Sequence, residues 1–445
     1  MGTRKTLIGA AAGLLGVALA EGAEVDGAAT AWLLVSTALV FLMVVGLALF
    51  YGGMVRGKNV LNTMMMSLAA LGFVGVGWAV LGYSLAFAEG SPWVGGLAHA
   101  FLRGVGMEGV DGLPHLLFMA FQATFAILTA ALITGALVER MRFPALLLFL
   151  TLWGLLVYAP IAHWVWGGGF LGELGVLDFA GGKVVHINAG VAALVGALVL
   201  GARKDYGRQA LLPHNVPLTL LGAGLLWFGW FGFNGGSALA ADGLAALALA
   251  NTLLAPAATV VVWTLLDLGR TGRATAVGLA TAVIVGLVAI TPAAGFVSPL
   301  SALAIGALAA FPSYYFLLWR ARSSLDDSLD VFGAHGAAGI TGALLTGVLA
   351  QEAWGGANGL LFGNPAQFGV QALAVGVAAG YSALGTFLLL KLTALLTPLR
   401  VSPKEEGLGL DVTQHGEEAY AGGEGAILVP SEATPPALRP MGGKA

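Results

Sequence analysis

The sequence predicts an all-α polytopic membrane protein with eleven transmembrane helices, arranged as an inverted repeat of five plus five helices and one final helix. Three observations predict this class. Hydrophobic residues make up 58% of the 445 positions and charged residues only 10%, whereas soluble chains carry about 25% charged residues. The apolar residues gather in runs long enough to cross a bilayer. The basic residues gather in every second connection between these runs.

Composition and charge exclude several classes of protein. The chain has 20 basic and 23 acidic residues, a formal net charge of −3, and no cysteine. A net charge this close to zero does not favour nucleic-acid binding, and a chain without cysteine has no disulfides, thiolate metal sites or cysteine nucleophiles. Of the 43 charged residues, 11 lie in residues 399–445. A polar tail therefore follows a hydrophobic body.

The N-terminus has the features of a signal peptide over residues 1–20. Arg4 and Lys5 precede an apolar run over 7–19, which is followed by a small residue. This run is too short for a spanning helix and has the pattern of a cleaved secretory signal. An uncleaved first helix is the alternative. The acidic stretch that begins at Glu21 suits an extracytoplasmic mature N-terminus.

Apolar runs of the length that a bilayer requires follow one another through most of the chain. A hydrocarbon core of ~30 Å needs about 20 helical residues, and charged, Pro-containing or Gly-rich breaks separate the runs. We expect a transmembrane domain over residues 21–398 and a cytoplasmic tail over 399–445, flexible beyond about residue 420. The expected spans are 31–52, 62–88, 113–137, 143–164, 184–202, 215–234, 243–268, 274–291, 299–319, 331–350 and 366–398.

The basic residues test this count, because Lys and Arg near span ends gather on the cytoplasmic side. Only Arg103 and Lys183 occupy the other set of connections. Eleven spans place the mature N-terminus outside and the tail in the cytoplasm, in a multi-pass protein of the cell (inner) membrane. Every second connection holds basic residues: Arg56 and Lys58; Arg140 and Arg142; Arg203, Lys204 and Arg208; Arg270 and Arg273; Arg320 and Arg322; Arg400 and Lys404.

A short motif occurs twice, each time near the start of an apolar run. Residues 186–191 and 335–340 both have the pattern H-x-x-A-G-[V/I]. The copies fall in the fifth and tenth spans, so each repeat has five helices and the second enters the membrane in the opposite direction. Inverted repeats of this kind are common in transporter folds.

The histidines of this motif are candidates for function. A histidine inside a transmembrane segment is costly unless it faces the bundle interior or a cavity. His186 and His335 suit the handling of protons or hydrogen bonding to a small polar solute, and hydrogen bonding between helices is the structural alternative. Two histidines without a third ligand make a poor metal site, so we expect no metal and no cofactor.

Aromatic side chains gather near the predicted outer face. Trp166 leaves the fourth span, and Phe121 and Phe125 lie four residues apart on one face of the third. Aromatic faces bind cations with about 0.5–2 kcal/mol, more when the ion is desolvated. An interfacial aromatic belt or core packing is the alternative. Ser237, which follows the aromatic-rich stretch 230–234, can add a hydroxyl acceptor or simply end a helix.

Two aspartates precede the histidines. Asp178 stands eight residues before His186, where it can bind a cation directly or cap the fifth helix. We favour a structural role that also makes the vestibule more negative, because a dehydrated carboxylate would hold an ion too tightly for fast release. Asp330, five residues before His335 on the inner side, is expected to cap the tenth helix.

Several longer motifs carry a family resemblance that extends from about residue 31 to 420. Together they resemble the ammonium transporter (Amt) branch of the Amt/Rh family. The motifs, in order, are FYGGMVRGKN at 50–59, AFQATF at 120–125, HWVWGGG at 163–169, DFAGG at 178–182, VHIN at 185–188, GWFGFN at 229–234, DVFGAHG at 330–336 and GLDVTQHGEEAY at 409–420.

The resemblance implies a homotrimer of eleven-helix protomers, each with its own pore between two inverted halves. It also implies that the tail motif and the inner loops dock a cytoplasmic PII-type signal protein. The site residues that it implies are Trp166, Phe125 and Ser237 for ammonium recruitment, with Phe121 at the rim; Phe125 and Phe233 for the outer gate; His186, His335 and Trp230 for the pore; Asp178 as the structural and electrostatic vestibule carboxylate; and Phe50 and Val331 for the inner exit.

Departures from the family pattern are modest. Val44-Val45-Gly46 stands where a proline before the glycine is expected, and Ala123-Thr124 replaces a Gly-Ser pair. Neither departure involves a side chain named for the pore. We therefore expect them to affect local helix packing rather than the substrate.

Residues and resemblance lead to one hypothesis: ammonium is captured outside, loses its proton near the gate, and crosses as ammonia past the histidines, with or without separate proton transfer. Potassium cannot become neutral, so the cost of desolvation excludes it. The alternative is an ammonium sensor that signals through its tail to a PII-type protein. An intramembrane enzyme is disfavoured, because the spans hold no paired catalytic aspartates, His-Glu zinc motif or nucleophile with a base.

Overall fold

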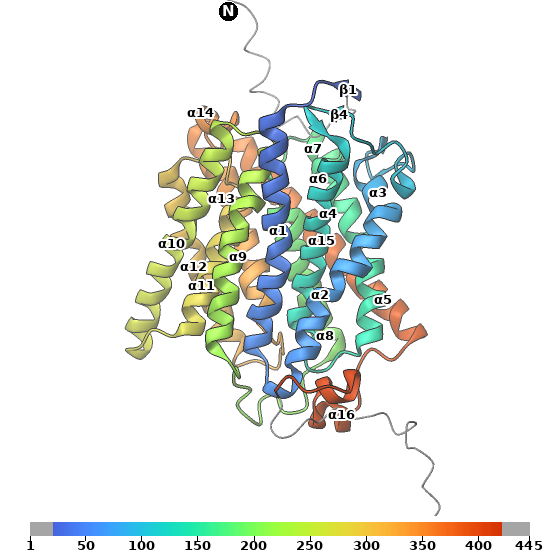
Figure 1. Cartoon of the computed structure of the whole chain (residues 1–445). Helices are drawn as coiled ribbons and strands as arrows, with labels where there is room; N and C mark the ends of the chain where they lie inside the picture. Colours follow the sequence, from blue (N-terminus) through green and yellow to red (C-terminus); the bar gives the residue numbers. More distant parts are fainter. Residues whose placement is uncertain (1–20, 421–445) are drawn as a thin grey trace, which may run out of the picture.

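Long apolar helices run between two opposite ends of the molecule and pack side by side as one bundle (Figure 1). The computed structural model describes residues 21–420. We call the end that carries α16 (Pro403–Leu408) the tail face, and the end that carries β1 (Glu21–Ala23) the N-terminal face. The expected signal peptide and the tail beyond residue 420 lie outside the described residues.

The helices follow the predicted runs, and several of them are interrupted by short π-helical turns, which share the label η with short 3-10 turns. The crossing elements are α1 (Gly27–Met54); α2 (Val60–Gly77) with η2 (Trp78–Gly82) and α3 (Tyr83–Phe87); α4 (His115–Ile133); α5 (Phe143–Trp153) with η5 (Gly154–Tyr158) and α6 (Ala159–Trp166); η6 (Gly182–Ile187) with α8 (Asn188–Leu200); α9 (Val216–Gly236); α10 (Gly243–Thr271); α11 (Ala276–Ile290); α12 (Pro299–Arg320); η7 (Phe332–Ala337) with α13 (Ala338–Leu349); and α15 (Pro365–Leu396).

Shorter elements cover the two faces. On the N-terminal face, one three-stranded sheet has the order β1-β4-β5 and a second pairs β2 with β3, all antiparallel. Their remaining bounds, with those of the short helices, are β2 (Gly90–Ser91), β3 (Val94–Gly95), β4 (Gly109–Val110), β5 (Leu113–Pro114), α7 (Phe170–Glu173), α14 (Glu352–Gly355) and the turns η1 (Gly57–Asn59), η3 (Ala100–Leu102), η4 (Thr134–Ala136), η8 (Leu360–Phe362) and η9 (Asp411–His415).

The helical membrane fold is confirmed, but the count of eleven full spans is not. Within residues 21–420, ten helical segments are at least 18 residues long and apolar enough to cross a membrane. The predicted span 274–291 corresponds to α11, which has only 15 residues. At 1.5 Å per residue such a helix falls short of a ~30 Å hydrocarbon core. By length alone, α11 is an apolar helix that is shorter than a full span.

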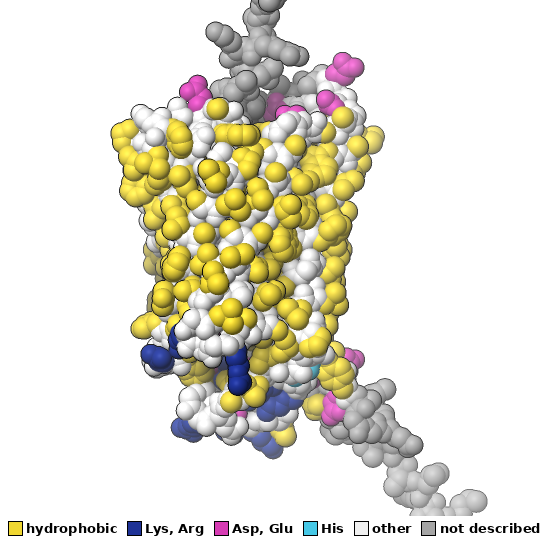
Figure 2. Space-filling model, turned by 90° about the vertical axis from the view of Figure 1, so that its left-hand side faces the viewer, with side chains coloured by type: hydrophobic (Ala, Val, Ile, Leu, Met, Phe, Trp, Pro, Cys, Tyr) yellow, Lys and Arg dark blue, Asp and Glu magenta, His cyan; other side chains and the backbone are white. Residues whose placement is uncertain are grey.

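The surface of the bundle has the polarity of a membrane protein. On the side that Figure 2 shows, hydrophobic side chains cover the middle of the bundle, Lys and Arg gather near the tail face, and Asp and Glu lie at both ends. Ion pairs join the basic connections to one another: Arg56 pairs with Asp205 at 3.0 Å, and Arg142 pairs with Glu405 of the tail at 3.3 Å. Connections that are far apart in sequence therefore share one face.

The two copies of the repeated motif cross each other at glycine residues, where the absence of a side chain lets the backbones approach closely. A methyl group on Gly190 would overlap the backbone nitrogen of Gly336, and one on Gly339 would lie 3.2 Å from the Cβ of His186. Each glycine of one copy thus packs against the histidine-bearing turn of the other. Small residues that let backbones approach closely are typical of helix contacts inside membranes.

The crossing yields a test of packing. Gly190→Ala should lower the free energy of unfolding by about 1–3 kcal/mol, because the added methyl group has no room against the backbone of η7. Gly376→Ala in α15 is the matched control, since open space surrounds that position, and it should have no such effect. Thermal unfolding of the purified protein in detergent compares the two variants, and equal stability would contradict this account.

Candidate functional site

Two histidines face each other at the centre of the bundle, each in a π-helical turn at the start of a broken helix. His186 lies in η6 and His335 in η7. Their Nδ1 atoms are 3.3 Å apart and the rings are nearly parallel, with centroids 5.4 Å apart and an interplanar angle of 22°. One imidazole must therefore donate and the other accept. Within residues 21–420, no cluster of three His, Cys, Asp or Glu side chains could hold a metal ion.

Aromatic rings pack against this histidine pair and extend from it toward the N-terminal face. The ring of His186 stacks on Trp230 with centroids 5.3 Å apart, and its centroid lies 5.9 Å from that of Phe233. Phe233 in turn stacks on Phe125 at 4.1 Å with an interplanar angle of 18°. Buried His186 Nε2 has no hydrogen-bond partner among the described residues. The column of rings thus contains a free polar atom, against which a small solute can hydrogen bond.

The end of the column nearest the N-terminal face combines aromatic faces with a hydroxyl group. Phe121 packs edge-on to Phe125 at 4.9 Å, and Trp166 does so at 6.1 Å. The indole nitrogen of Trp166 donates to the carbonyl oxygen of Asp178 at 2.9 Å, which holds the ring in place. Ser237 directly follows α9, and its hydroxyl donates to the Phe233 carbonyl at 2.8 Å. The lone pairs of the Ser237 oxygen remain available as acceptors.

An apolar pocket continues the column toward the tail face. Trp230 borders it and is fixed by a 2.9 Å hydrogen bond from its indole nitrogen to the Thr291 hydroxyl. Val331 is buried at the start of η7 and is not among the lining residues. The pocket is lined by Met43, Leu47, Phe50, Leu128, Leu132, Leu226, Trp230, Ile284 and His335. A wall of this composition offers few polar contacts to replace the water around an ion.

Asp178 caps the first histidine-bearing turn. Its carboxylate accepts hydrogen bonds from the backbone N–H groups of residues 181–184, with the Lys183 nitrogen at 2.7 Å. These are the N–H groups that a helix start leaves without intrahelical partners, and here they are buried inside the protein. The side chain of Asp178 is itself buried and oriented by these bonds.

The second histidine-bearing turn has the same cap, but the prediction that Asp330 supplies it is wrong. Asp327 accepts from the backbone nitrogens of Val331 and Phe332 at 3.0 and 2.8 Å. The side chain of Asp330 instead pairs with Arg320 of α12 at 2.6 Å. Asp327 stands eight residues before His335, the spacing at which the first-half cap precedes its own histidine. That repeated spacing is the sequence signal that could have identified Asp327.

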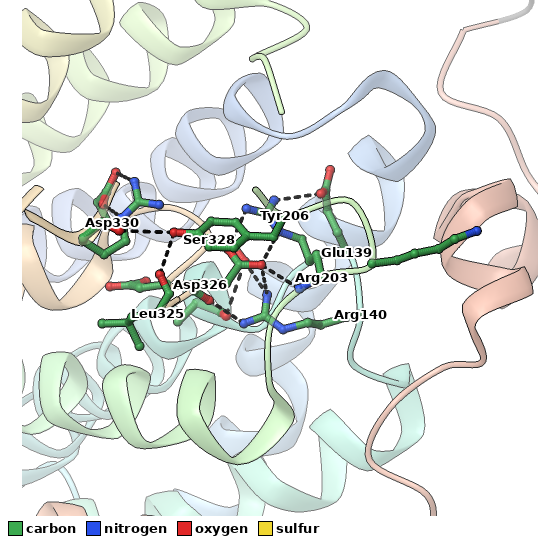
Figure 3. A network of polar contacts seen from close by, with 12 residues as sticks. Glu139, Arg140, Arg203, Tyr206, Leu325, Asp326, Ser328 and Asp330 are labelled. Carbon is green, nitrogen blue, oxygen red and sulfur yellow. Dashed lines mark hydrogen bonds and ion pairs between the residues drawn. The ribbon is translucent and has the colours of Figure 1, made fainter. Parts of the chain in front are cut away.

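A buried ionic network that lies on the tail face was not predicted from the sequence. Figure 3 shows its central members, which come from loops of both halves. Glu139 is fully buried and accepts from Arg203 at 2.8 Å and from Arg56 at 3.1 Å. Arg203 also donates to both carboxylate oxygens of Asp326. The arginines hold the pKa of Glu139 down at about 2, despite the opposing effect of burial. The network ties the loops that surround the tail-face end of the column.

The tail is bonded to this network. Leu410 donates its backbone N–H to Asn59 Oδ1 at 2.8 Å, and the amide nitrogen of Asn59 donates to Glu139 at 2.9 Å. Asp411 accepts from the backbone nitrogens of Leu61 and Asn62, so a tail residue caps the start of α2. The described tail is therefore docked on the bundle.

A bundle of apolar helices with two inverted, broken elements that meet at buried histidines defines a polytopic membrane transport protein. The comparisons with known proteins agree with this class. The chain belongs to the ammonium transporter family, because the model of the Ammonium Transporter Family matches residues 31–420.

Relatives of known name and structure resemble the chain over most of its length. An ammonium transporter of Aquifex aeolicus is 49% identical over 408 residues, which cover 91% of this chain and 96% of that protein. The crystal structure of Saccharomyces cerevisiae Mep2 matches with a TM-score of 0.80 and 36% identity, over 85% of this chain and 88% of that one. A structure described as a Sensor Amt Protein matches with a TM-score of 0.82 and 30% identity, over 87% and 98%.

The ionic network yields a prediction about stability. Glu139→Gln should lower the free energy of unfolding by about 3–5 kcal/mol at pH 7, because Arg203 and Arg56 each lose one of their two carboxylate partners inside the protein. The folded pKa of about 2 lies below the ordinary value of 4.5, so the stabilisation by Glu139 is present above pH 4.5 and is lost as the pH falls toward 2. Thermal unfolding across this range measures both effects. The exposed variant Glu89→Gln is the control and should match the wild type.

Proposed function

We propose that this protein transports ammonium, recruiting NH4+ at the N-terminal face and passing NH3 along the ring column to the tail face. The observation that carries the proposal is the uninterrupted series of contacts from Trp166 through Phe125 and Phe233 to the two facing histidines. This order presents a cation site first, an apolar barrier second and proton-accepting groups third.

Capture uses the outer end of the column. The faces of Trp166 and Phe121 attract a cation, and the free lone pairs of Ser237 accept a hydrogen bond from it. Potassium matches ammonium in charge but has no hydrogen to donate to the serine oxygen. Asp178 contributes negative charge nearby while its oxygens remain engaged with backbone N–H groups, so it attracts the ion without binding it tightly.

The stacked pair of Phe125 and Phe233 is the gate. Rings in contact at 4.1 Å leave no space for a hydrated ion until they move apart. An ion that enters must therefore lose water, and nothing behind the gate compensates fully for that loss. Ammonium can escape the cost by giving up a proton and continuing as neutral ammonia, which potassium cannot do.

The histidine pair receives the solute and its proton behind the gate. The free Nε2 of His186 accepts a hydrogen bond from ammonia or takes its proton, and the 3.3 Å contact to His335 offers that proton a next acceptor. Transport is electrogenic where the proton travels along this pair and electroneutral where it returns outside. Ammonia then passes the pocket lined by Phe50, with Val331 beside the inner exit.

The charges and the family support a proposal for orientation and assembly. The basic connections at the tail face put this face in the cytoplasm of a cell (inner) membrane protein. The column lies within a single chain, so the proposed homotrimer has three separate pores. The tail face, with its docked tail, is the surface on which a PII-type signal protein binds.

A sensing function is the second candidate. The similarity to a structure described as a Sensor Amt Protein favours it, as does the hydrogen-bonded path from the tail to the loops under the column. A sensor would bind ammonium at the same outer site and alter the docking of its tail. Transport measurements separate the two functions.

The histidines provide the main test. Purified protein in proteoliposomes on a solid-supported membrane should give currents with ammonium and none with potassium. His186→Ala and His335→Ala should each reduce the ammonium current by tenfold or more, on the order expected when a positioned proton acceptor is removed. Unchanged currents and unchanged potassium rejection in both variants would rule out the relay, and a silent wild type with unchanged internal pH would favour the sensor.

The outer site provides a second test. Ser237→Ala removes one hydrogen-bond acceptor and should raise the half-saturating ammonium concentration about 12- to 150-fold, which corresponds to the loss of one hydrogen bond from a charged donor, while the maximal current changes little. Ser301 lies near the start of α12, away from the column, and Ser301→Ala is the control. A fall in maximal current without a change in half-saturation would place Ser237 outside the capture step.

A further inference from the structure

The second histidine-bearing turn differs from the first at the residue where the chain enters it. In the first half this residue is Gly181 with φ of +115°, and at the matching position in the second half it is Asp330 with φ of +58°. Both stand five residues before their histidine. Glycine adopts left-handed backbone at little cost, whereas a residue with a Cβ meets a steric penalty there. Asp330 must be held in this conformation by its surroundings.

Arg320 supplies that restraint. As the last residue of α12, it donates from Nε to Asp330 Oδ1 at 2.6 Å and from Nη2 to Oδ2 at 2.9 Å. Such a two-point contact fixes both the position and the plane of the carboxylate. The carbonyl oxygen of Arg320 accepts a hydrogen bond from the Tyr206 hydroxyl at 3.2 Å, and Figure 3 shows Tyr206 and Asp330 together at the edge of the network.

The restraint reaches the histidine through one turn of backbone. The carbonyl oxygen of Asp330 accepts from the nitrogen of Ala334 at 2.9 Å, and Ala334 immediately precedes His335. The matching bond in the first half joins Val185 to Gly181, also at 2.9 Å. A change in the backbone of residue 330 rotates the peptide that starts this turn, and the imidazole moves with it.

We propose that the Arg320–Asp330 pair is a positioning element for the second pore histidine: it holds the left-handed residue from which η7 begins and so sets the spacing of the two imidazole rings. Neither side chain contacts the substrate in this role. The transport readout rests on the proposed function, but the geometry can be tested without transport.

Asp330 is also placed to respond to pH at the tail face. The charged groups around it are Arg320 of α12, Asp327 of its own loop and Arg203 of the loop after α8. Burial raises the pKa of Asp330 to about 7, against the opposing effect of Arg320, and 21% of the side chain is exposed to solvent. A protonated carboxyl holds a guanidinium less firmly than a carboxylate does. The pair therefore loosens as the pH falls through about 7.

The raised pKa of Asp330 has different consequences for the position of His335 and for the stability of the fold. A folded pKa above the ordinary 3.8 means that the folded state is stabilised when Asp330 is protonated, and that this stabilisation is lost as the pH rises through about 7. Acidification of the tail face should therefore weaken the positioning of His335 without lowering the contribution of Asp330 to the free energy of unfolding.

Glycine at position 330 is the decisive substitution, because it keeps the left-handed turn without needing the ion pair. We would compare Asp330→Gly, Asp330→Ala, Arg320→Gln and the double variant Arg320→Gln/Asp330→Gly in proteoliposomes. Ammonium currents and hydrogen exchange of residues 332–337 are measured in the same preparations. Arg322→Gln, an exposed arginine two residues further on, is the matched control and should leave both readouts unchanged.

The expected pattern is a rescue. Asp330→Ala and Arg320→Gln should lower the current about tenfold and speed the exchange of η7, the scale set by the penalty for a non-glycine residue in left-handed backbone. Asp330→Gly should stay within about twofold of wild type and lose the dependence on tail-face pH near 7. The double variant should behave like Asp330→Gly, because glycine no longer needs Arg320.

Two results would overturn the proposal: an Asp330→Gly protein as impaired as Asp330→Ala, or a double variant no better than Arg320→Gln. If Asp330→Ala fails to fold, the comparison of Arg320→Gln with the double variant still decides. A wild type without ammonium current would contradict the proposed function instead. The exchange of η7 would then test the positioning role by itself, since it does not depend on transport.

Discussion

The structure depends on the capping of two helices that start inside the protein rather than at its surface. Buried backbone N–H groups without partners are too costly in an apolar environment, so a broken helix needs an internal acceptor. Asp178 and Asp327 supply it, each eight residues before a histidine. The two caps set where the π-helical turns begin, and the turns bring His186 and His335 together. The ring contacts on either side follow from that placement.

The bundle could be predicted from the sequence because its causes are local. Runs of apolar residues, the alternation of basic connections and the echoed histidine motif are each visible over a few tens of residues, and the structure confirms a helical membrane fold of the ammonium transporter type. The side chains expected along the column lie in contact with one another from Trp166 to His335. Their roles in transport remain predictions. The length of each span was predicted less well than its apolar character, because α11 is apolar but has only 15 residues.

The polar interactions were harder to predict because they depend on pairing between distant segments. Arg203 resembles any other basic residue at a span end, and nothing near it indicates that it pairs with Glu139, 64 positions away, and with Asp326, 123 positions away. Asp330 was chosen as the cap because it is nearer to His335, but a left-handed backbone directs its carboxylate to Arg320 instead. Position relative to the repeat was a better guide than distance along the chain.

The glycine crossing limits how the molecule can move. In many transporters one repeat rocks against the other to expose a central site to each side in turn. Here the backbone at Gly190 touches that at Gly336, and Gly339 touches the turn of His186. The two main chains are in direct contact and leave no space between them. Sliding one half of the molecule past the other would therefore break this contact and separate the two histidines. The contact therefore leaves side chains such as the phenylalanine pair freer to move than the two halves of the frame.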